Sequence, residues 1–371
     1  MEYIKEIEKL LGEIRSLAAR EGKLSGFTIG NTAKNGDNGL FLTPVRNTSI
    51  MVVAGVIVYS VRQAIDAAMI VDGRVDYIMV DAEKKVADAM SLSGKPANVE
   101  RAVRESVKSS ALWIYKGNDV AVEAMDSFLS YITKDSLRGI GGRKVAILGA
   151  GNLGCKLALK LVERGADVVI TRRNGEKLAA ITEALNYIKP AYTLAKVTST
   201  TDNLEAARDA DVLIGMTQGI PVITARMIQS LSPGALVVEA GKGTFFDDAI
   251  EAVDRLNIEV YRLDITGAFD GVINNLFATE NLIKNRMGRS VIGGVRVVSG
   301  GLLGRRGEIV VDNVHDPAII YGIADGNGDF IRDKNTEYSG DLESVKSHIL
   351  SKNGTASAGG TVPGREGLYG K

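Results

Sequence analysis

Three glycines at a fixed spacing are the residues of this chain that point most directly to cofactor chemistry. They follow the apolar run Val145 to Leu148, and a helical pattern of leucines comes next. This is the G-x-G-x-x-G arrangement between strand and helix, which allows a tight turn, close approach of a pyrophosphate and close helix–strand packing. The start of such a helix also offers N–H groups and a positive dipole end to phosphates. The spacing predicts a dinucleotide site with the loop residues Gly149, Gly151, Asn152, Leu153 and Gly154.

The residues after the next apolar strand indicate which dinucleotide would bind. Asp167 to Ile170 has the pattern of that strand, and Thr171, Arg172 and Arg173 follow it. An NAD site usually has an acid at this point, whereas arginine pairs with the 2′-phosphate of NADP. We therefore expect NADP as the cofactor, with NAD as the less favoured choice. The alternative is a Rossmann-like fold whose site binds nothing.

Later strands continue the same alternation of strand and helix. The patterns at 211–215, 235–239 and 259–263 are typical of buried parallel strands separated by helices. Thr217 and Gly241 follow the first two of these strands, and we expect them to lie near the nicotinamide. The alternation predicts an α/β fold with a doubly wound parallel sheet.

A hydride site also needs residues that handle a proton, and two earlier segments qualify. Asp81, Lys84 and Lys85 come directly after the buried strand pattern at 77–80, and Asn118 with Asp119 opens a helix. Ligands bind at the carboxyl ends of strands in open α/β sheets, and a lysine beside a carboxylate can orient a hydroxyl or amine. The pattern predicts Lys84 or Lys85 with Asp119 as the proton-handling pair, and Asp81 and Asn118 as substrate ligands. The structural alternative is solvated lysines and an N-cap aspartate.

Asn31 and Thr32 begin a polar, glycine-bearing loop after a possible first strand at 27–29. Their amide and hydroxyl groups are suited to lining a substrate pocket. A surface loop would have the same composition, so both interpretations stay open.

The segments Tyr77 to Lys85 and Gly117 to Phe128 resemble those of the shikimate dehydrogenase-like enzymes, as does Thr171 to Asn174. In that family a catalytic lysine follows a strand, an Asn-Thr-Asp segment opens the linking helix, and an Asn-Arg-Thr motif binds NADP. The resemblance covers roughly residues 27 to 270 and implies a two-domain NADP-dependent dehydrogenase. The chain has no Ser-x-Ser near Gly30 and continues for about 100 residues after Gly267. The pyrrolysine-forming and methylene-tetrahydrofolate dehydrogenases share this architecture, so oxidation of C–O and of C–N both remain possible.

The whole chain is expected to have four parts. Residues 1–138 form an α/β substrate domain that starts with an amphipathic helix over 1–20, and residues 139–290 form the Rossmann domain. A C-terminal extension, 291–350, has short strands at 295–298 and 308–311 and a hairpin that turns at 325–329. Residues 351–371 are rich in Gly, Ser and Thr and are expected to be disordered. Helices are expected at 99–113, 120–132 and 274–285.

Composition excludes several classes of function. Forty-five basic and 45 acidic residues balance, which disfavours nucleic acid or an acidic membrane as partner. One cysteine and two histidines argue against an internal disulfide, a metal site and Ser/His/Asp catalysis. The N-terminal segment is charged and the longest apolar run, 50–61, is too short to cross a bilayer. We expect a soluble, cytoplasmic protein, and a homodimer built on the apolar faces of the N-terminal helix or the C-terminal segment.

These observations together predict an NADP-dependent dehydrogenase or reductase that acts on the C–OH or C–NH centre of a small polar molecule. One alternative is a methylene-tetrahydropterin-type dehydrogenase. The other is a non-catalytic NAD(P)-binding sensor or structural protein.

Overall fold

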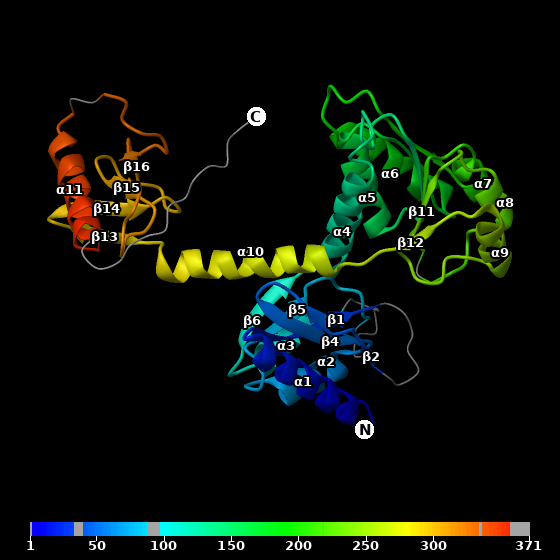
Figure 1. Cartoon of the computed structure of the whole chain (residues 1–371), viewed down its shortest axis with the longest axis horizontal. Coiled ribbons are helices and arrows are strands. Elements are labelled where there is room, and N and C mark those ends of the chain that lie inside the picture. Colours follow the sequence, from blue (N-terminus) through cyan, green and yellow to red (C-terminus); the bar gives the residue numbers. More distant parts are fainter. Residues whose placement is uncertain (1, 33–39, 88–96, 218, 334–335, 357–371) are drawn as a thin grey trace. The chain divides into compact units, whose positions relative to one another are not determined.

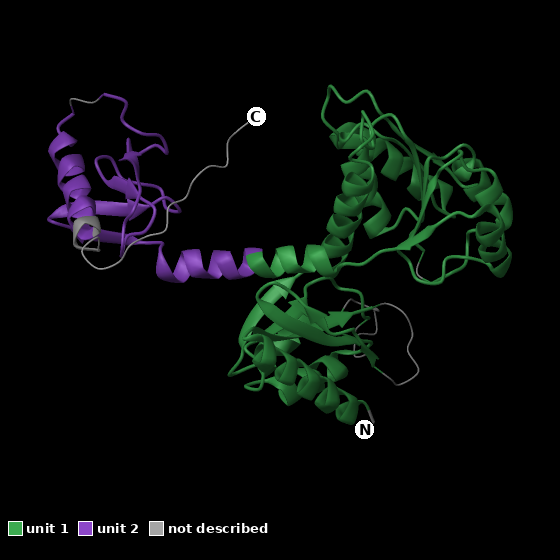
Figure 2. Cartoon of the chain, in the orientation of Figure 1, with its two compact units in different colours: residues 1–274 green, residues 275–371 purple. Residues whose placement is uncertain are grey.

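Helices and parallel strands alternate through the first two thirds of the chain (Figure 1). The computed structural model describes residues 2–32, 40–87, 97–217, 219–333 and 336–356. The chain divides into two compact units, Met1–Asn274 and Asn275–Lys371, and the division falls within one helix (Figure 2).

The first sheet of unit 1 has the strand order β2-β4-β1-β5-β6, with β3 also paired to β4. Strands β4, β1, β5 and β6 are mutually parallel, whereas β2 and β3 run antiparallel to β4. The strands are β1 (Leu24–Asn31), β2 (Phe41–Leu42), β3 (Arg46–Asn47), β4 (Met51–Val58), β5 (Tyr77–Asp81) and β6 (Ala111–Tyr115). The helices that share its core are α1 (Glu2–Glu21), α2 (Val61–Val71) and α3 (Val99–Ser106).

Helix α1 buries its apolar stripe inside its own domain. Ile7, Leu11 and Ile14 are fully buried and belong to one core cluster with Phe27 and Ile29 of β1. The apolar face of the helix, set by its 3.6-residue period, thus packs against the apolar face of the strand, set by its two-residue period. This stripe is therefore not a free face for dimerisation.

Helix α4 (Gly117–Ile132) leads into the second sheet of unit 1, whose order is β12-β11-β10-β7-β8-β9 with every pair parallel. The chain moves outward from β7 to β9, then returns to the other side of β7 for β10 to β12. This confirms the predicted α/β fold with a doubly wound sheet, and the crevice at its switch point opens beyond β7 and β10. The strands are β7 (Lys144–Leu148), β8 (Asp167–Thr171), β9 (Val197–Thr200), β10 (Val212–Gly215), β11 (Leu236–Glu239) and β12 (Val260–Arg262). The helices are α5 (Asn152–Glu163), α6 (Gly175–Ile188), α7 (Asn203–Ala207), α8 (Ala225–Gln229) and α9 (Asp247–Leu256).

The expected helix over 99–113 was wrong in its second half, where the chain forms strand β6. The carboxylate of Asp72 accepts the backbone N–H groups of Lys108, Ser109 and Ser110, which turns the chain away from the helix. The segment then pairs in parallel with β5. A tertiary contact thus overrides the local helical pattern.

Helix α10 (Thr266–Asn285) begins eight residues before the expected 274. The carboxylate of Asp264 accepts both the N–H and the hydroxyl of Thr266, which defines the helix start. The first part of α10 belongs to unit 1, and its Phe269 and Ile273 are buried.

Unit 2 contains a sheet of order β13-β14-β15-β16 packed against α11 through Val345 and Ile349. The expected strands at 295–298 and 308–311 are confirmed as β14 and β15. The expected hairpin is only partly formed, because β16 pairs with β15 and a single bridge joins Ala324 to Phe330 beyond the turn. The elements are β13 (Arg289–Ile292), β14 (Val295–Ser299), β15 (Ile309–Val311), β16 (Ile320–Ile323) and α11 (Ser339–Ala356).

The expected disordered tail was wrong for residues 351–356, which form the end of α11. The remainder of that tail lies outside the described residues. In the part of the chain that the structure describes, no helix combines the length and apolarity that crossing a bilayer requires.

Candidate functional site

The glycine loop between β7 and α5 has the geometry that a bound pyrophosphate requires. Gly149 has φ 120°, and a Cβ placed there would lie 2.9 Å from the carbonyl oxygen of Met216. A Cβ on Gly154 would lie 2.2 Å from the carbonyl oxygen of Gly149, so this glycine permits close packing of helix and loop. A Cβ on Gly151 would meet nothing within 4 Å, and this residue is the N-cap of α5 without a side-chain capping bond. The loop therefore leaves open space at the helix start, where a phosphate would bind.

The end of β8 is joined directly to this loop. The N–H of Ala150 donates to the carbonyl oxygen of Thr171 at 2.7 Å, and Nη1 of Arg172 donates to the carbonyl oxygen of Ala150 at 2.7 Å. Thr171 is buried, Arg172 is half-buried and Arg173 is exposed. One arginine is thus held against the glycine loop and the next is free to reach solvent. Both follow β8 at the point where the ribose of a dinucleotide lies in folds of this type.

Thr217 and Gly241 lie beside each other at the carboxyl ends of β10 and β11. A Cβ on Gly241 would come within 2.0 Å of the carbonyl oxygen of Thr217, so only glycine allows this approach. The Thr217 hydroxyl donates to the carbonyl oxygen of Ile220 at 2.6 Å. Their position beyond the switch point agrees with the expected place beside the nicotinamide, and that role stays a prediction.

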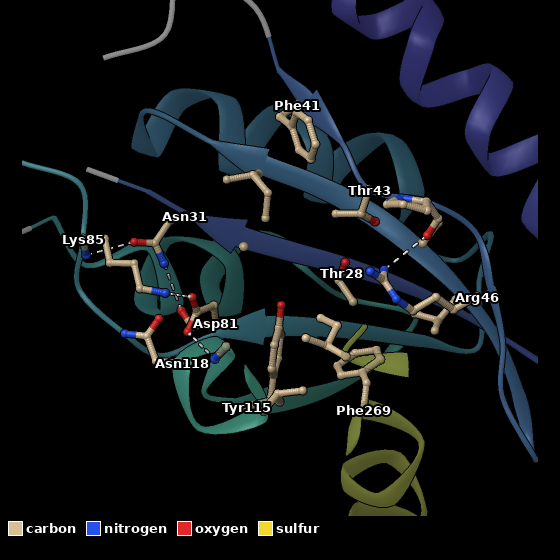
Figure 3. A pocket seen from close by; sticks show the side chains of 18 residues that line it. Thr28, Asn31, Phe41, Thr43, Arg46, Asp81, Lys85, Tyr115, Asn118 and Phe269 are labelled. Carbon is tan, nitrogen blue, oxygen red and sulfur yellow. Dashed lines mark hydrogen bonds and ion pairs between the residues drawn. The ribbon is translucent and has the colours of Figure 1, made fainter. Parts of the chain in front are cut away.

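A cavity of about 280 Å³ lies against the first sheet, on the face opposite α1, α2 and α3 (Figure 3). Thr28 and Val53 of this wall alternate with the core residues Phe27 and Val52, as the two-residue period of a strand requires. Most of its wall is apolar, and a few polar groups point inward, which is typical of sites for small molecules. The lining residues are Thr28, Gly30, Asn31, Phe41, Thr43, Pro44, Arg46, Val53, Ala54, Ile57, Asp81, Lys85, Tyr115, Gly117, Asn118, Val120, Ile265 and Phe269.

Lys85 and Asp81 form an ion pair in the wall of this cavity. Nζ of Lys85 lies 2.8 Å from Oδ2 of Asp81 and 2.9 Å from Oε2 of Glu83. Asp81 is buried, and its Oδ1 accepts the N–H groups of Glu83 and Gly117. Burial by itself would lower the pKa of Lys85, but the hydrogen bonds and charges of Asp81 and Glu83 outweigh it and raise that pKa. Lys85 is therefore a protonated hydrogen-bond donor at neutral pH.

Two asparagines hold this pair and connect it to the cofactor loop. Oδ1 of Asn31 accepts the N–H of Lys85 at 2.9 Å, which orders the chain after β5. The N–H of Asn118 donates to Glu83 at 2.8 Å, and its Nδ2 donates to Oδ1 of Asn152 at 3.1 Å. Asn152 is the first residue of α5, directly after the glycine loop. The cavity with its lysine is thus adjacent to the predicted dinucleotide site.

The structure does not form the predicted pair between a lysine of the 84–85 segment and Asp119. Lys84 is exposed and, like Asp119 and Thr32, does not line the cavity. The Asp119 carboxylate is half exposed and pairs with Lys156 of α5, because α4 packs along α5 at this point. Asp81, which we expected to bind substrate, is the residue that pairs with Lys85. The structure thus brings Asp81, and not Asp119, to Lys85, and the catalytic role of these residues stays a prediction.

Three cavity residues were missed because they belong to strands or a helix end that the sequence pattern did not show. Tyr115 lies on β6, which begins within the expected helix over 99–113. Arg46 lies on a two-residue strand, and Phe269 lies on the early part of α10. The Phe269 ring packs edge-on against Tyr115 with centroids 5.5 Å apart. Leu112 and Ile114 face the helix-covered core, whereas Tyr115 faces the cavity. This two-residue alternation is the signal that could have identified β6.

The Tyr115 hydroxyl forms no hydrogen bond to another described residue. Burial, and then the charge of Asp81, raise the pKa of Tyr115, so its hydroxyl stays protonated. Figure 3 shows this hydroxyl pointing into the cavity between Lys85 and Arg46. It is available to donate to a ligand.

Residues 144–242 match the family described as NADP oxidoreductase, coenzyme F420-dependent. A glycerol-3-phosphate dehydrogenase [NAD(P)+] of Geobacter metallireducens is 28% identical over 144 residues, which is 38% of this chain and 43% of that protein. A glutamyl-tRNA reductase of Caldivirga maquilingensis is 28% identical over 162 residues, which is 38% of this chain and 40% of that protein. Among solved structures, L-tryptophan dehydrogenase from Nostoc punctiforme aligns with 68% of this chain and 73% of its own, at 14% identity and a TM-score of 0.39.

The chain thus covers less than half the length of these two curated relatives. Residues 144–242 are an NAD(P)-binding domain of the oxidoreductase type. The shikimate dehydrogenase-like resemblance is not confirmed beyond this coarser likeness.

Proposed function

We propose that the protein is an NADP-dependent dehydrogenase or reductase that acts on the C–OH or C–NH centre of a small polar molecule. The observation that carries this proposal is the ion pair of Lys85 and Asp81 in the wall of a cavity that Asn118 links to the glycine loop through Asn152. A binding module would need the cofactor loop alone, whereas a proton-handling pair beside it is what hydride transfer requires.

The cofactor residues support NADP over NAD. Gly151 leaves room for the pyrophosphate, and Arg172 is already held against the loop by its bond to Ala150. Guanidinium groups pair strongly with phosphate, so Arg172 and Arg173 would bind the 2′-phosphate. When bound, the nicotinamide supplies or accepts a hydride at the reacting carbon.

Lys85 would orient the reacting group and supply its proton. In the reductive direction the carbon of a C=O or C=N group gains a hydride, and its oxygen or nitrogen gains a proton from Nζ of Lys85. In the oxidative direction the same proton leaves the substrate and can pass to the Asp81 carboxylate, 2.8 Å from Nζ. Asp81 and Glu83 hold the ammonium group in place. The geometry serves an oxygen and a nitrogen equally, so both bond types belong to the proposal.

A matched pair of lysine variants tests the proposal. Purified protein is first screened for NADPH oxidation with small carbonyl compounds and for NADP reduction with small hydroxy and amino compounds. With a substrate found, Lys85→Met should lower kcat about a hundredfold or more, the usual scale for a proton-transfer group. Lys84→Met removes the neighbouring exposed lysine and should leave kcat unchanged. NADPH affinity should be the same in both variants.

Equal turnover in Lys85→Met and the wild type would refute the role of Lys85. NADPH binding without hydride transfer to any compound of the screen would favour the non-catalytic sensor instead.

A further inference from the structure

Arg46 brings a second positive charge to the cavity, at the end away from Lys85. It lies on β3 opposite Val53 of β4, which in turn lies opposite Gly26 of β1. Val80 of β5 lies opposite Ile29 of β1, so Asp81 is level with the next residue of β1, Gly30. Arg46 is level with Gly26, four residues earlier on the same strand. At about 3.3 Å per residue, the two backbone levels are roughly 13 Å apart along the sheet. Figure 3 shows Arg46 and the pair of Lys85 and Asp81 on opposite sides of Tyr115.

The guanidinium of Arg46 has unused donors. Its Nη1 donates to the carbonyl oxygen of Pro44 at 3.3 Å, and among the described residues it has no carboxylate within 4.0 Å. Asp264 is the nearby acid: hydrogen bonds from Thr266, and then the charge of Arg46, lower the pKa of Asp264. The Asp264 carboxylate is bonded to Thr266 at the start of α10. An arginine has five N–H donors, so most of those of Arg46 remain available to a ligand.

Two hydroxyl groups beside Arg46 also lack protein partners. No hydrogen bond joins the hydroxyl of Thr28 or of Tyr115 to another residue in the described part of the chain, and both residues line the cavity. Gly30 keeps this part of the wall open, because a Cβ there would lie 2.6 Å from Cδ1 of Ile57. Both hydroxyls belong to residues that line the cavity, so a polar ligand bound there can accept their hydrogen bonds.

We infer that the cavity takes a small acid whose anionic group, a carboxylate or a phosphate monoester, binds Arg46 while its reacting carbon lies near Lys85. The substrate would carry its acid group and its reacting carbon at separate ends, because the two cations stand at separate levels of the sheet. Val53, Ile57 and Phe269 provide an apolar wall between them, suited to a short hydrocarbon spacer. The inference rests on the proposed function for the reacting end only, and the anion site stands on Arg46 itself.

Binding of three simple probes tests the anion site without turnover. Benzoate, phenyl phosphate and benzamide share a ring of the same size, and only the first two are anions. Isothermal titration in the presence of NADPH should show at least one anion bound tenfold or more tightly than benzamide. The preferred anion distinguishes a carboxylate substrate from a phosphate ester.

Variants assign the affinity to Arg46. Arg46→Gln should weaken anion binding tenfold or more and leave the affinity for benzamide unchanged. The anion affinity of Arg46→Lys should lie between those of the wild type and Arg46→Gln, because lysine keeps the charge but lacks the planar guanidinium. Tyr115→Phe should weaken anion binding a few-fold, because it removes one hydrogen-bond donor. Arg20→Gln, at an exposed arginine of α1, is the matched control and should bind like the wild type. Unfolding temperatures measured alongside show that each variant is folded.

Anion affinity that is equal in the wild type and Arg46→Gln, or no anion preference at all, would overturn the inference. In that event hydride transfer to neutral substrates, with its dependence on Lys85, would leave the proposed function intact. Conversely, anion binding that depends on Arg46 in a protein without hydride transfer would support the site and refute the enzyme.

Discussion

Two alanine substitutions in the glycine loop should separate cofactor binding from stability. Gly151 has φ −93°, which alanine adopts readily, and a methyl there would meet nothing within 4 Å. Gly151→Ala should therefore keep or raise the free energy of unfolding, by about 0.4–1 kcal/mol, through the less flexible unfolded chain. The same methyl would occupy the space into which a pyrophosphate must fit. NADPH should bind at least tenfold more weakly, a loss of about 1.4 kcal/mol.

Gly154→Ala, in contrast, should lower the free energy of unfolding. Its methyl would lie 2.2 Å from the carbonyl oxygen of Gly149 and 3.4 Å from Cγ2 of Ile147, and the first contact is with backbone that cannot rotate away. Overpacking costs about 1–3 kcal/mol, and the better helix propensity of alanine returns at most about 1 kcal/mol. We expect a net loss of about 1–2 kcal/mol in the free energy of unfolding.

Urea unfolding and fluorescence titration with NADPH measure the two effects on the same samples. Wild-type NADPH affinity in Gly151→Ala would refute the place assigned to the pyrophosphate. Wild-type stability in Gly154→Ala would refute the packing role of that glycine.

Three further outcomes are expected. Replacing Arg172 and Arg173 by alanine should remove the preference for NADPH over NADH, at about 1.5–3 kcal/mol for each charge-assisted bond, and unchanged NADPH affinity in titrations would contradict this. Because its partners raise the pKa of Lys85 above the usual 10.5, its ion pair should stabilise the fold fully below that pH and progressively less above it. The stability difference between wild type and Lys85→Met should accordingly shrink in urea unfolding between pH 9 and pH 11.5; a constant difference would count against the pair. Light scattering should give twice the 39.5 kDa monomer mass, and a monomer at micromolar concentration would rule out the predicted homodimer.

The dinucleotide domain could be derived from the sequence because its signals are local. Gly149, Gly151 and Gly154 lie within six residues of one another, and the strand before them and the helix after them each have their own periodicity. Arg172 lies at the end of the next strand, and the parallel βαβ connection returns that end to the same edge of the sheet. Chain geometry alone therefore predicts that these residues meet.

The carboxylate that pairs with Lys85 was decided by the tertiary structure. Asp81 and Asp119 both lie at the end of an element, where a catalytic carboxylate could lie. Because α4 packs along α5, Asp119 pairs with Lys156, and Asp81 is the buried carboxylate that pairs with Lys85. Two aspartates in equivalent sequence contexts differ in role because a competing cation comes from another helix, and no pattern within either segment contains that information.

The substrate end of the cavity also depended on tertiary structure. Thr28, Arg46, Tyr115 and Phe269 come from four elements that are far apart along the chain. Sequence periodicity states which face of an element is buried, but not which other element covers it. The side chains of this cavity face one another because β3 pairs with β4, β5 with β6, and α10 lays Phe269 against Tyr115. Those contacts are set by the free energy of the whole fold, since each is a long-range pairing that no local preference specifies.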